Sequence, residues 1–416
     1  MKKTAKILIL ILLGLPFPSF SAPKPYVILI SFDGFRWDYL NRGISPNLEA
    51  VLENGVSALS LRPAFPSKTF PNHLSIITGM YPAHHGIISN NFADPFEKIT
   101  STGSSNKFES ELWYMMKDTG TTQDERWYLG ESFWETAERQ GIITASYFWP
   151  GNNLHAKFRR PTYVESYEYG RPDEPRIKKI IEWLSLPQNK RPHFITLYFQ
   201  DTDDAGHDYG PNSPEVNKAI EKLDGITGLL FKSLDKINLR DSVNVIFVSD
   251  HGMTEISKDR AINIEKIVGQ NKALFYDDGP LMTVMPLNGD TLAVYNALKK
   301  SEKHYKVYMR DRLPAYYHYS DNPFIAPIII VADLGWSLVK DKKDKWLDES
   351  KGNHGYDNNE TDMHGIFLAI GPNFKHGYRT GTLWNIDIYP LLCKIFNIMP
   401  RSNIDGKLER IGFILK

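Results

Sequence analysis

Short apolar runs recur along this chain, most of them ending abruptly in polar residues, and this pattern constrains the fold most strongly. Runs that are apolar throughout are typical of strands buried on both faces of a sheet. Amphipathic helices are predicted between them, so the pattern indicates an α/β fold with a mostly parallel central sheet and helices on both faces. The four predicted strands are YVILISFDG (26–34), HFITLYFQD (193–201), VNVIFVSDHG (243–252) and GIFLAIGP (365–372).

Three of the helices are predicted from their start signals. The segment 45–55 begins with Ser45 as an N-cap, and the segment 132–141 begins with a Ser-x-x-Glu capping box. Ser213 opens a longer helix whose apolar residues recur at helical spacing.

Residues from about 280 to 345 depart from this alternation and predict a small β-α-β insertion. No internal repeat separates the chain into equivalent halves. We therefore predict one domain over residues 22–416 that carries a small inserted cap, rather than two independent domains.

The N-terminus has the pattern of a signal peptide. Three lysines precede the apolar run 7–15, and the small residues Ser19 and Ser21 follow it. The run is shorter than the roughly 20 residues that a membrane span needs, so cleavage after Ser21 would leave no stable span. We expect an exported protein, periplasmic or secreted, with an N-terminal membrane anchor as the alternative.

Charge and cysteine content exclude some classes of function. Lysine plus arginine and aspartate plus glutamate both number 49, which argues against a broad basic groove for a nucleic-acid polymer. A small anionic substrate remains compatible with zero net charge. The only cysteine is Cys393, so no disulfide within the chain can form and no metal site can be built from thiols.

Four short clusters place aspartate or histidine at predicted strand ends or in polar loops. Because ligands bind at the carboxyl edge of such sheets, we expect these side chains to lie together. Their nitrogen and oxygen donors suit zinc or a similar divalent ion, and there are enough of them for two ions. The candidates are Asp33 (SFDGFRWD), Asp203 and His207 (DTDDAGHDYG), Asp250 and His251 (SDHGM) and His354 (GNHGYDN). His364 in MHGIF competes with His354, and the residues alone do not separate the two.

The segment FPSKTFPNHLSIITGMYPAHHG (65–86) supplies a candidate nucleophile. Thr69 is a weak nucleophile by itself, and metal coordination is one way to activate it. Two ions about 4 Å apart can hold the attacking and leaving oxygens of a phosphoryl displacement. Ser67 is a rival nucleophile and Ser75 a weaker one, and Thr69 could instead only cap a helix.

Five motifs in order resemble the nucleotide pyrophosphatase/phosphodiesterases of the alkaline phosphatase superfamily. They are SFDGFRWDYL, KTFPNHLSIITGMYPAHHGI, DDAGHDYGP, SDHGM and HGYDN, and the resemblance runs from about residue 25 to 400. It implies an alkaline-phosphatase-like core and a hydrolase with two Zn²⁺ ions as cofactors.

The resemblance also implies a role for each site residue. One zinc would be held by Asp33, Thr69, Asp250 and His251, and the other by Asp203, His207 and His354. Thr69 would attack phosphorus, and water would hydrolyse the resulting phospho-threonine. Asn90 would donate a hydrogen bond to a non-bridging phosphate oxygen.

The substrate pocket follows less directly from the resemblance. Phe70 and a tyrosine, Tyr167 or Tyr169, would sandwich a nucleotide base. We assign Lys68, which precedes the nucleophile, to the same substrate-binding set, together with Trp149 and Pro150 of the FWPG element.

Two positions depart from the nucleotide-specific members of that family. Leu129 stands where they carry lysine, and Asn153 where they carry aspartate. Both departures weaken the expectation of selectivity for one base, and neither affects the expected ligands or nucleophile.

The leading prediction is an enzyme that hydrolyses phosphodiester or pyrophosphate bonds and releases nucleoside 5'-monophosphates. Its partner would be a small nucleotide or phosphodiester, and the oligomeric state is not predicted. The alternatives are a lipid or choline phosphodiesterase of the same family, a phosphate monoesterase, and an inactive binding protein on this fold.

Overall fold

The computed structural model describes residues 24–96, 99–102, 107–110, 113–340 and 345–416. The predicted signal peptide, residues 1–21, lies outside the described residues and stays a prediction.

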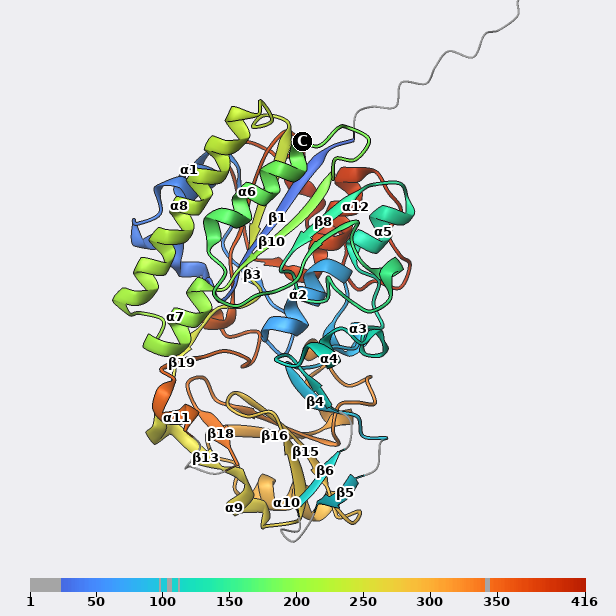
Figure 1. Cartoon of the computed structure of the whole chain (residues 1–416). Coiled ribbons are helices and arrows are strands. Elements are labelled where there is room, and N and C mark those ends of the chain that lie inside the picture. Colours follow the sequence, from blue (N-terminus) through green and yellow to red (C-terminus); the bar gives the residue numbers. More distant parts are fainter. Residues whose placement is uncertain (1–23, 97–98, 103–106, 111–112, 341–344) are drawn as a thin grey trace, which may run out of the picture.

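An eight-stranded sheet forms the centre of the larger part of the molecule (Figure 1). Strand β1 pairs in parallel with β10 and β11, and β8 continues the parallel order. In spatial order the strands are β21 (Tyr378–Thr380), β2 (Val56–Ala58), β20 (Phe367–Ile370), β11 (Val243–Val248), β1 (Tyr26–Phe32), β10 (Phe194–Phe199), β8 (Thr144–Tyr147) and β9 (Tyr163–Glu165). The predicted α/β fold with a mostly parallel sheet is confirmed.

Strand β20 is the exception in direction, because it pairs antiparallel with both β11 and β2. Its carboxyl end therefore lies at the opposite edge from the ends of β1, β10 and β11. This explains why GIFLAIGP alone among the predicted strands does not end in aspartate.

Helices cover both faces of this sheet, as Figure 1 shows. Alternation along β1 sends Val27 and Leu29 into one apolar core and Ile28 and Ile30 into the other. The first core includes residues of α2 (Thr69–Thr78), α5 (Phe133–Arg139) and α12 (Ile388–Phe396). The second includes residues of α1 (Pro46–Asn54), α6 (Asp173–Leu184) and α8 (Pro214–Lys236).

Two of the three predicted helix starts use the expected side chains. Ser132 and Glu135 form the capping box of α5, and Ser213 accepts a hydrogen bond from the Val216 N–H at the start of α8. Ser45 occupies the N-cap position of α1, but its side chain makes no capping hydrogen bond. The Pro at the first position of α1 supplies the helical φ there instead.

A second, four-stranded sheet lies at one end of the large sheet (Figure 1). Three of its strands lie within residues 280–345, the predicted insertion, and the fourth precedes residue 280. Its strands are β14 (Ala273–Tyr276), β15 (Leu281–Pro286), β17 (Ile328–Ala332) and β16 (Tyr305–Met309), antiparallel throughout, with helix α10 (Thr291–Lys300) between β15 and β16.

Shorter elements lie between the long strands and helices. Helix α7 (Asp201–Tyr209) follows β10, and α3 (Pro82–His85) follows α2. The paired short strands are β12 (Thr254–Glu255) with β19 (Gly352–Asn353), β13 (Ala261–Asn263) with β18 (Ser337–Val339), β3 (Leu61–Arg62) with β22 (Leu383–Trp384), β4 (Asn91–Ala93) with β7 (Trp113–Met115), and β5 (Ile99–Thr102) with β6 (Lys107–Ser110). The other short α-helices are α4 (Thr119–Thr122), α9 (Ile264–Val268) and α11 (Trp346–Glu349).

Among the helices that the structure describes, none combines the length and apolar character that crossing a bilayer requires.

Candidate active site

The first group of candidate ligands lies where β1 and β11 end. Asp33 follows β1, and Asp250 and His251 follow β11. The ε-nitrogen of His251 is 3.3 Å from Oδ1 of Asp33 and 3.0 Å from Oδ2 of Asp250. These three side chains are buried, and one donor atom from each lies within 4.8 Å of the others. A single cation could contact all three.

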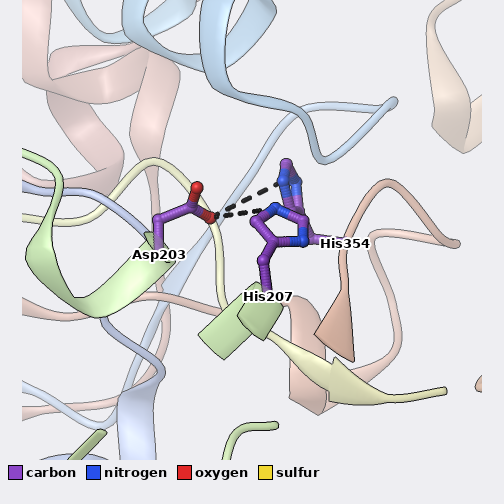
Figure 2. Close-up of side chains that lie close together, drawn as sticks. All are labelled: Asp203, His207 and His354. Atoms are coloured by element: carbon purple, nitrogen blue, oxygen red, sulfur yellow. Dashed lines mark ion pairs between the residues drawn. The ribbon is translucent and has the colours of Figure 1, made fainter. Parts of the chain in front are cut away.

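The second group joins helix α7 to the loop after β19 (Figure 2). Asp203 and His207 are one turn apart on α7, so they share a face of the helix. Oδ1 of Asp203 is 3.5 Å from Nε2 of His207 and 3.7 Å from Nε2 of His354. The rings of His354 and His251 stack with centroids 3.5 Å apart, so the two groups adjoin.

The three imidazoles are oriented in the same manner. In His207, His251 and His354, Nδ1 lies 2.9 Å from a backbone carbonyl, of Gly352, Gly252 and Ser67 respectively. A carbonyl only accepts, so each Nδ1 carries the proton. In a neutral ring Nε2 then presents a lone pair to the carboxylates, which is the arrangement found in metal-ligating histidines.

The carboxylate oxygens that face these imidazoles also indicate a metal site. Oδ1 of Asp33, Oδ1 of Asp203 and Oδ2 of Asp250 are buried and have no hydrogen-bond partner among the described residues. Buried carboxylate oxygens are costly without a partner. Unpaired oxygens beside imidazole lone pairs are a donor set that fits divalent cations such as zinc.

Burial and crowding shift the pKa values of these groups. Burial first, and then the charges of Asp250 and Asp203, raises the pKa of Asp33 well above its ordinary value. Burial, with added repulsion from the neighbouring histidines, lowers the pKa of His354 well below its ordinary value. His354 is therefore neutral near pH 7, as a metal ligand must be.

Thr69 is the first residue of α2, and its hydroxyl lies beside the first group. Oγ1 of Thr69 is 3.2 Å from Nε2 of His251. The hydroxyls of the two rival nucleophiles are engaged elsewhere, since Ser67 donates to the Tyr356 carbonyl and Ser75 contacts His85. The geometry therefore favours Thr69 over both serines.

His364, the competitor of His354, does not reach either group of ligands. Its Nδ1 lies 2.9 Å from the Ser60 hydroxyl, and its Nε2 lies 3.2 Å from the carbonyl of Asn358. Both ring nitrogens are thus occupied by hydrogen bonds, which leaves His354 as the histidine at the site.

The side chain of Asn90 is oriented by the residue after the candidate nucleophile. Oδ1 of Asn90 accepts a 3.0 Å hydrogen bond from the backbone N–H of Phe70. This fixes which end of the amide is oxygen and leaves the Nδ2 protons for another acceptor. A donor held beside Thr69 is what a developing charge on a phosphate oxygen requires.

Three other predicted substrate-binding residues differ in their exposure to solvent. Tyr167 is half-exposed and packs edge-on against Phe148 and Tyr198, whereas Trp149 is 1% exposed. The Trp149 indole donates to the carbonyl of His73, and Pro150 is also buried. Contact of Trp149 and Pro150 with a substrate stays a prediction.

Lys68 has a protein partner in the structure. Its ammonium lies 2.5 Å from Oδ2 of Asp277, and both side chains are 7% exposed. Binding of substrate by Lys68 stays a prediction.

Two residues beside the ligands were not identified from the sequence. The hydroxyl of Tyr198 donates a 2.6 Å hydrogen bond to Oδ2 of Asp33. The buried imidazole of His73 lies 3.5 Å from Oδ2 of Asp250 and also contacts Ser31. Tyr198 lies near the carboxyl end of β10, which is the one signal in the sequence that could have marked it.

The comparison with protein families identifies the chain's relatives. A family model described as type I phosphodiesterase/nucleotide pyrophosphatase matches residues 27–357. The chain belongs to this family. It is therefore a hydrolase of the nucleotide pyrophosphatase/phosphodiesterase type, as the five motifs predicted.

Curated relatives match most of the chain. It is 36% identical over 380 residues to ectonucleotide pyrophosphatase/phosphodiesterase family member 5 of Homo sapiens, covering 90% of the chain and 76% of the relative. It is 34% identical over 396 residues to the bis(5'-adenosyl)-triphosphatase of Xenopus laevis, covering 95% and 82%. Family member 1 of Homo sapiens is 35% identical over 404 residues, but the match covers 94% of the chain and 42% of that longer relative.

Solved structures give the same result for the fold. An inactive variant of murine ectonucleotide pyrophosphatase/phosphodiesterase 5, with alanine in place of a threonine, was solved in complex with AMP. It matches with a TM-score of 0.86 and 32% identity, over 94% of this chain and 100% of that chain. The predicted alkaline-phosphatase-like fold is confirmed.

Proposed function

We propose that the protein is an exported two-zinc phosphodiesterase and nucleotide pyrophosphatase that releases nucleoside 5'-monophosphates. The observation that carries this proposal is the position of the Thr69 hydroxyl, 3.2 Å from Nε2 of His251 and beside unpaired carboxylate oxygens. The Thr69 hydroxyl and the candidate ligands thus lie close enough together to act on one substrate.

The ligand set divides as the two groups in the structure do. Asp33, Thr69, Asp250 and His251 would hold one zinc ion, and Asp203, His207 and His354 would hold the other. Bound zinc supplies positive charge that activates a hydroxyl nucleophile and offsets charge on phosphate oxygens.

The chain's own residues would carry the reaction in two steps. Oγ1 of Thr69 loses its proton and attacks phosphorus, the bond to the leaving oxygen breaks, and the leaving group takes up a proton. Water then attacks the phospho-threonine and restores the threonine hydroxyl, releasing a 5'-monophosphate. The amide of Asn90 would donate to a non-bridging oxygen throughout, since its Oδ1 is held by the Phe70 N–H.

Aromatic side chains support a nucleotide as substrate. Phe70 is half-buried beside Thr69, and the half-exposed ring of Tyr167 packs against Tyr198, whose hydroxyl binds Asp33. A base held between Phe70 and Tyr167 would lie close to the phosphate site. The AMP complex of the murine relative, in a variant inactive through loss of a threonine, supports the same assignment.

Export is supported by the N-terminal sequence alone. The lysine-rich start, the short apolar run and the small residues before position 22 are those of a secretory signal.

Hydrolysis of two chromogenic esters by the zinc-loaded enzyme tests the proposal. We expect strong preference for the p-nitrophenyl ester of thymidine 5'-monophosphate over p-nitrophenyl phosphate. A chelator should abolish the activity and zinc should restore it. Preference for the simple monoester would contradict the proposal and favour a phosphatase.

A further inference from the structure

A buried ion pair connects the residue before the proposed nucleophile to the second sheet. Nζ of Lys68 lies 2.5 Å from Oδ2 of Asp277, which follows β14, and both side chains are 7% exposed. The hydroxyl of Ser89 donates to the same carboxylate oxygen. The charge of Lys68 is thus balanced by a carboxylate from a different part of the fold.

The path of the Lys68 side chain is closely confined. It crosses Gly355, where an added Cβ would lie 2.9 Å from Lys68 Cε and where φ is +117°. Only glycine allows this approach with that backbone conformation. The Lys68 stem therefore lies against the residue that follows the proposed ligand His354.

Two hydrogen bonds join the residue before Lys68 to the residues that flank Gly355. The carbonyl of Ser67 accepts from Nδ1 of His354 at 2.9 Å, and the hydroxyl of Ser67 donates to the carbonyl of Tyr356 at 2.9 Å. Lys68 is the N-cap residue of α2, so its backbone sets where Thr69 begins the helix. A shift of the Lys68 backbone would therefore move Thr69. It would also disturb the contact between the Lys68 side chain and Gly355.

Removing either charge of the Lys68–Asp277 ion pair is expected to be costly. A buried ammonium or carboxylate that loses its partner remains in a low-dielectric environment without compensation. Asp277 also has φ of +65°, a conformation that aspartate and asparagine tolerate better than most residues. Such conformations persist where the surrounding contacts hold them, as the contacts from Lys68 and Ser89 do here.

We propose that Asp277 is a positioning residue, which acts through Lys68 to hold the first turn of α2 so that Thr69 faces His251 and the substrate phosphate. This inference rests on the proposed function of Thr69. It assigns the Lys68 ammonium to Asp277 and not to the substrate. The predicted substrate-binding role of Lys68 is the alternative that the experiment must exclude.

Steady-state kinetics with a nucleotide diester test the inference through single variants. Lys68→Met keeps the length of the stem, and Asp277→Asn keeps a residue that tolerates the left-handed φ. We expect each to lower kcat on the order of 100-fold with KM near the wild-type value, because the nucleophile is displaced while other substrate contacts remain. Lys68→Arg, which retains the charge, should recover much of the loss.

The double variant Lys68→Met/Asp277→Asn gives the decisive comparison. It leaves no unpaired buried charge, so we expect it to be at least as active as either single variant. Zinc bound per chain and the unfolding transition are measured for every variant, to identify any that fails to fold. Lys258→Met, which breaks the exposed ion pair with Asp348, serves as the matched control and should retain wild-type kcat and KM.

Two results would overturn the inference. One is a double variant whose loss equals the product of the single losses. The other is a fully active Asp277→Asn beside a Lys68→Met whose KM alone rises, which would return Lys68 to substrate binding. A wild-type enzyme without diesterase activity would instead overturn the proposed function itself, so the two failures are distinguishable.

Discussion

The phenol of Tyr198 donates a 2.6 Å hydrogen bond to Oδ2 of Asp33, while Oδ1 of the same carboxylate has no hydrogen-bond partner among the described residues. One oxygen of Asp33 is therefore fixed by the protein and the other is left for a ligand. Removing a group that orients a metal ligand typically lowers metal affinity by about 10- to 100-fold, so Tyr198 should matter if Asp33 binds an ion as proposed.

Tyr198→Phe should weaken zinc binding by about 10-fold, because Asp33 loses the donor that orients it. Competition with a chromogenic chelator measures this affinity directly. Tyr39→Phe is the matched control, since the buried hydroxyl of Tyr39 has no hydrogen-bond partner in the described part of the chain. Equal zinc affinity of wild type and Tyr198→Phe would show that the hydrogen bond has no such role.

Asn90→Asp should lower kcat by about 10²-fold or more, because the carboxylate cannot donate to a phosphate oxygen. The substitution keeps the acceptor for the Phe70 N–H and nearly the same size, so the loop should remain in place. Asn90→Ala, which removes donor and acceptor together, should be no more active. Steady-state kinetics at saturating zinc make the comparison, and an unchanged kcat in Asn90→Asp would exclude Asn90 from charge stabilisation.

Zinc affinity should fall as the pH falls, starting well above the ordinary titration range of aspartate. Burial and the charges of Asp250 and Asp203 raise the pKa of Asp33, so a proton competes with the ion at higher pH than at an exposed carboxylate. His354 should contribute little to this competition, because burial lowers its pKa. His251 should add to it, because burial, which lowers its pKa, is outweighed by charge and hydrogen-bond interactions, chiefly with Asp250, which raise it. Chelator competition between pH 5 and pH 8 measures the slope, and a flat profile would contradict the assignment of Asp33 as a ligand.

A second pH effect concerns stability at α3. The hydrogen bond to Asp405 raises the pKa of His84, and the ion pair is partly exposed. Because the folded pKa lies above the unfolded one, the stabilisation is complete below the unfolded pKa of about 6.5 and is lost as the pH rises through the folded value. We expect His84→Gln to reduce the free energy of unfolding by about 0.5 kcal/mol at pH 5.5, since a pair this exposed is screened.

Urea unfolding of wild type and His84→Gln at pH 5.5 and pH 8.5 measures this difference. The two proteins should become equal in stability at the higher pH. A difference that grows with pH would reverse the expected sign and exclude the ion pair as its cause.

The sheet and its ligand-bearing edge could be predicted because both depend on local patterns. Asp33 and Asp250 each follow a continuous apolar run, and parallel strands bring such positions to one edge without any knowledge of side-chain contacts. The antiparallel direction of β20 could not be read in this way, because an apolar run has the same appearance in either direction.

The features of the site that could not be predicted depend on contacts between segments that are distant in the sequence. His354 and His364 both precede glycine, and only the hydrogen bonds of His364 to Ser60 and Asn358 separate them. The pairing of Lys68 with Asp277 has no local signal, because it depends on how the second sheet lies against α2. A lysine beside a nucleophile is equally consistent with binding substrate and with binding a carboxylate.

The central claim is that Thr69 is the nucleophile of a two-zinc site. The most direct test is the turnover of the p-nitrophenyl ester of thymidine 5'-monophosphate by Thr69→Ala, compared with wild type at matched bound zinc. We predict a fall on the order of 10³-fold or more, as found when a nucleophile is removed from other hydrolases. Turnover by Thr69→Ala at the wild-type rate would contradict the account.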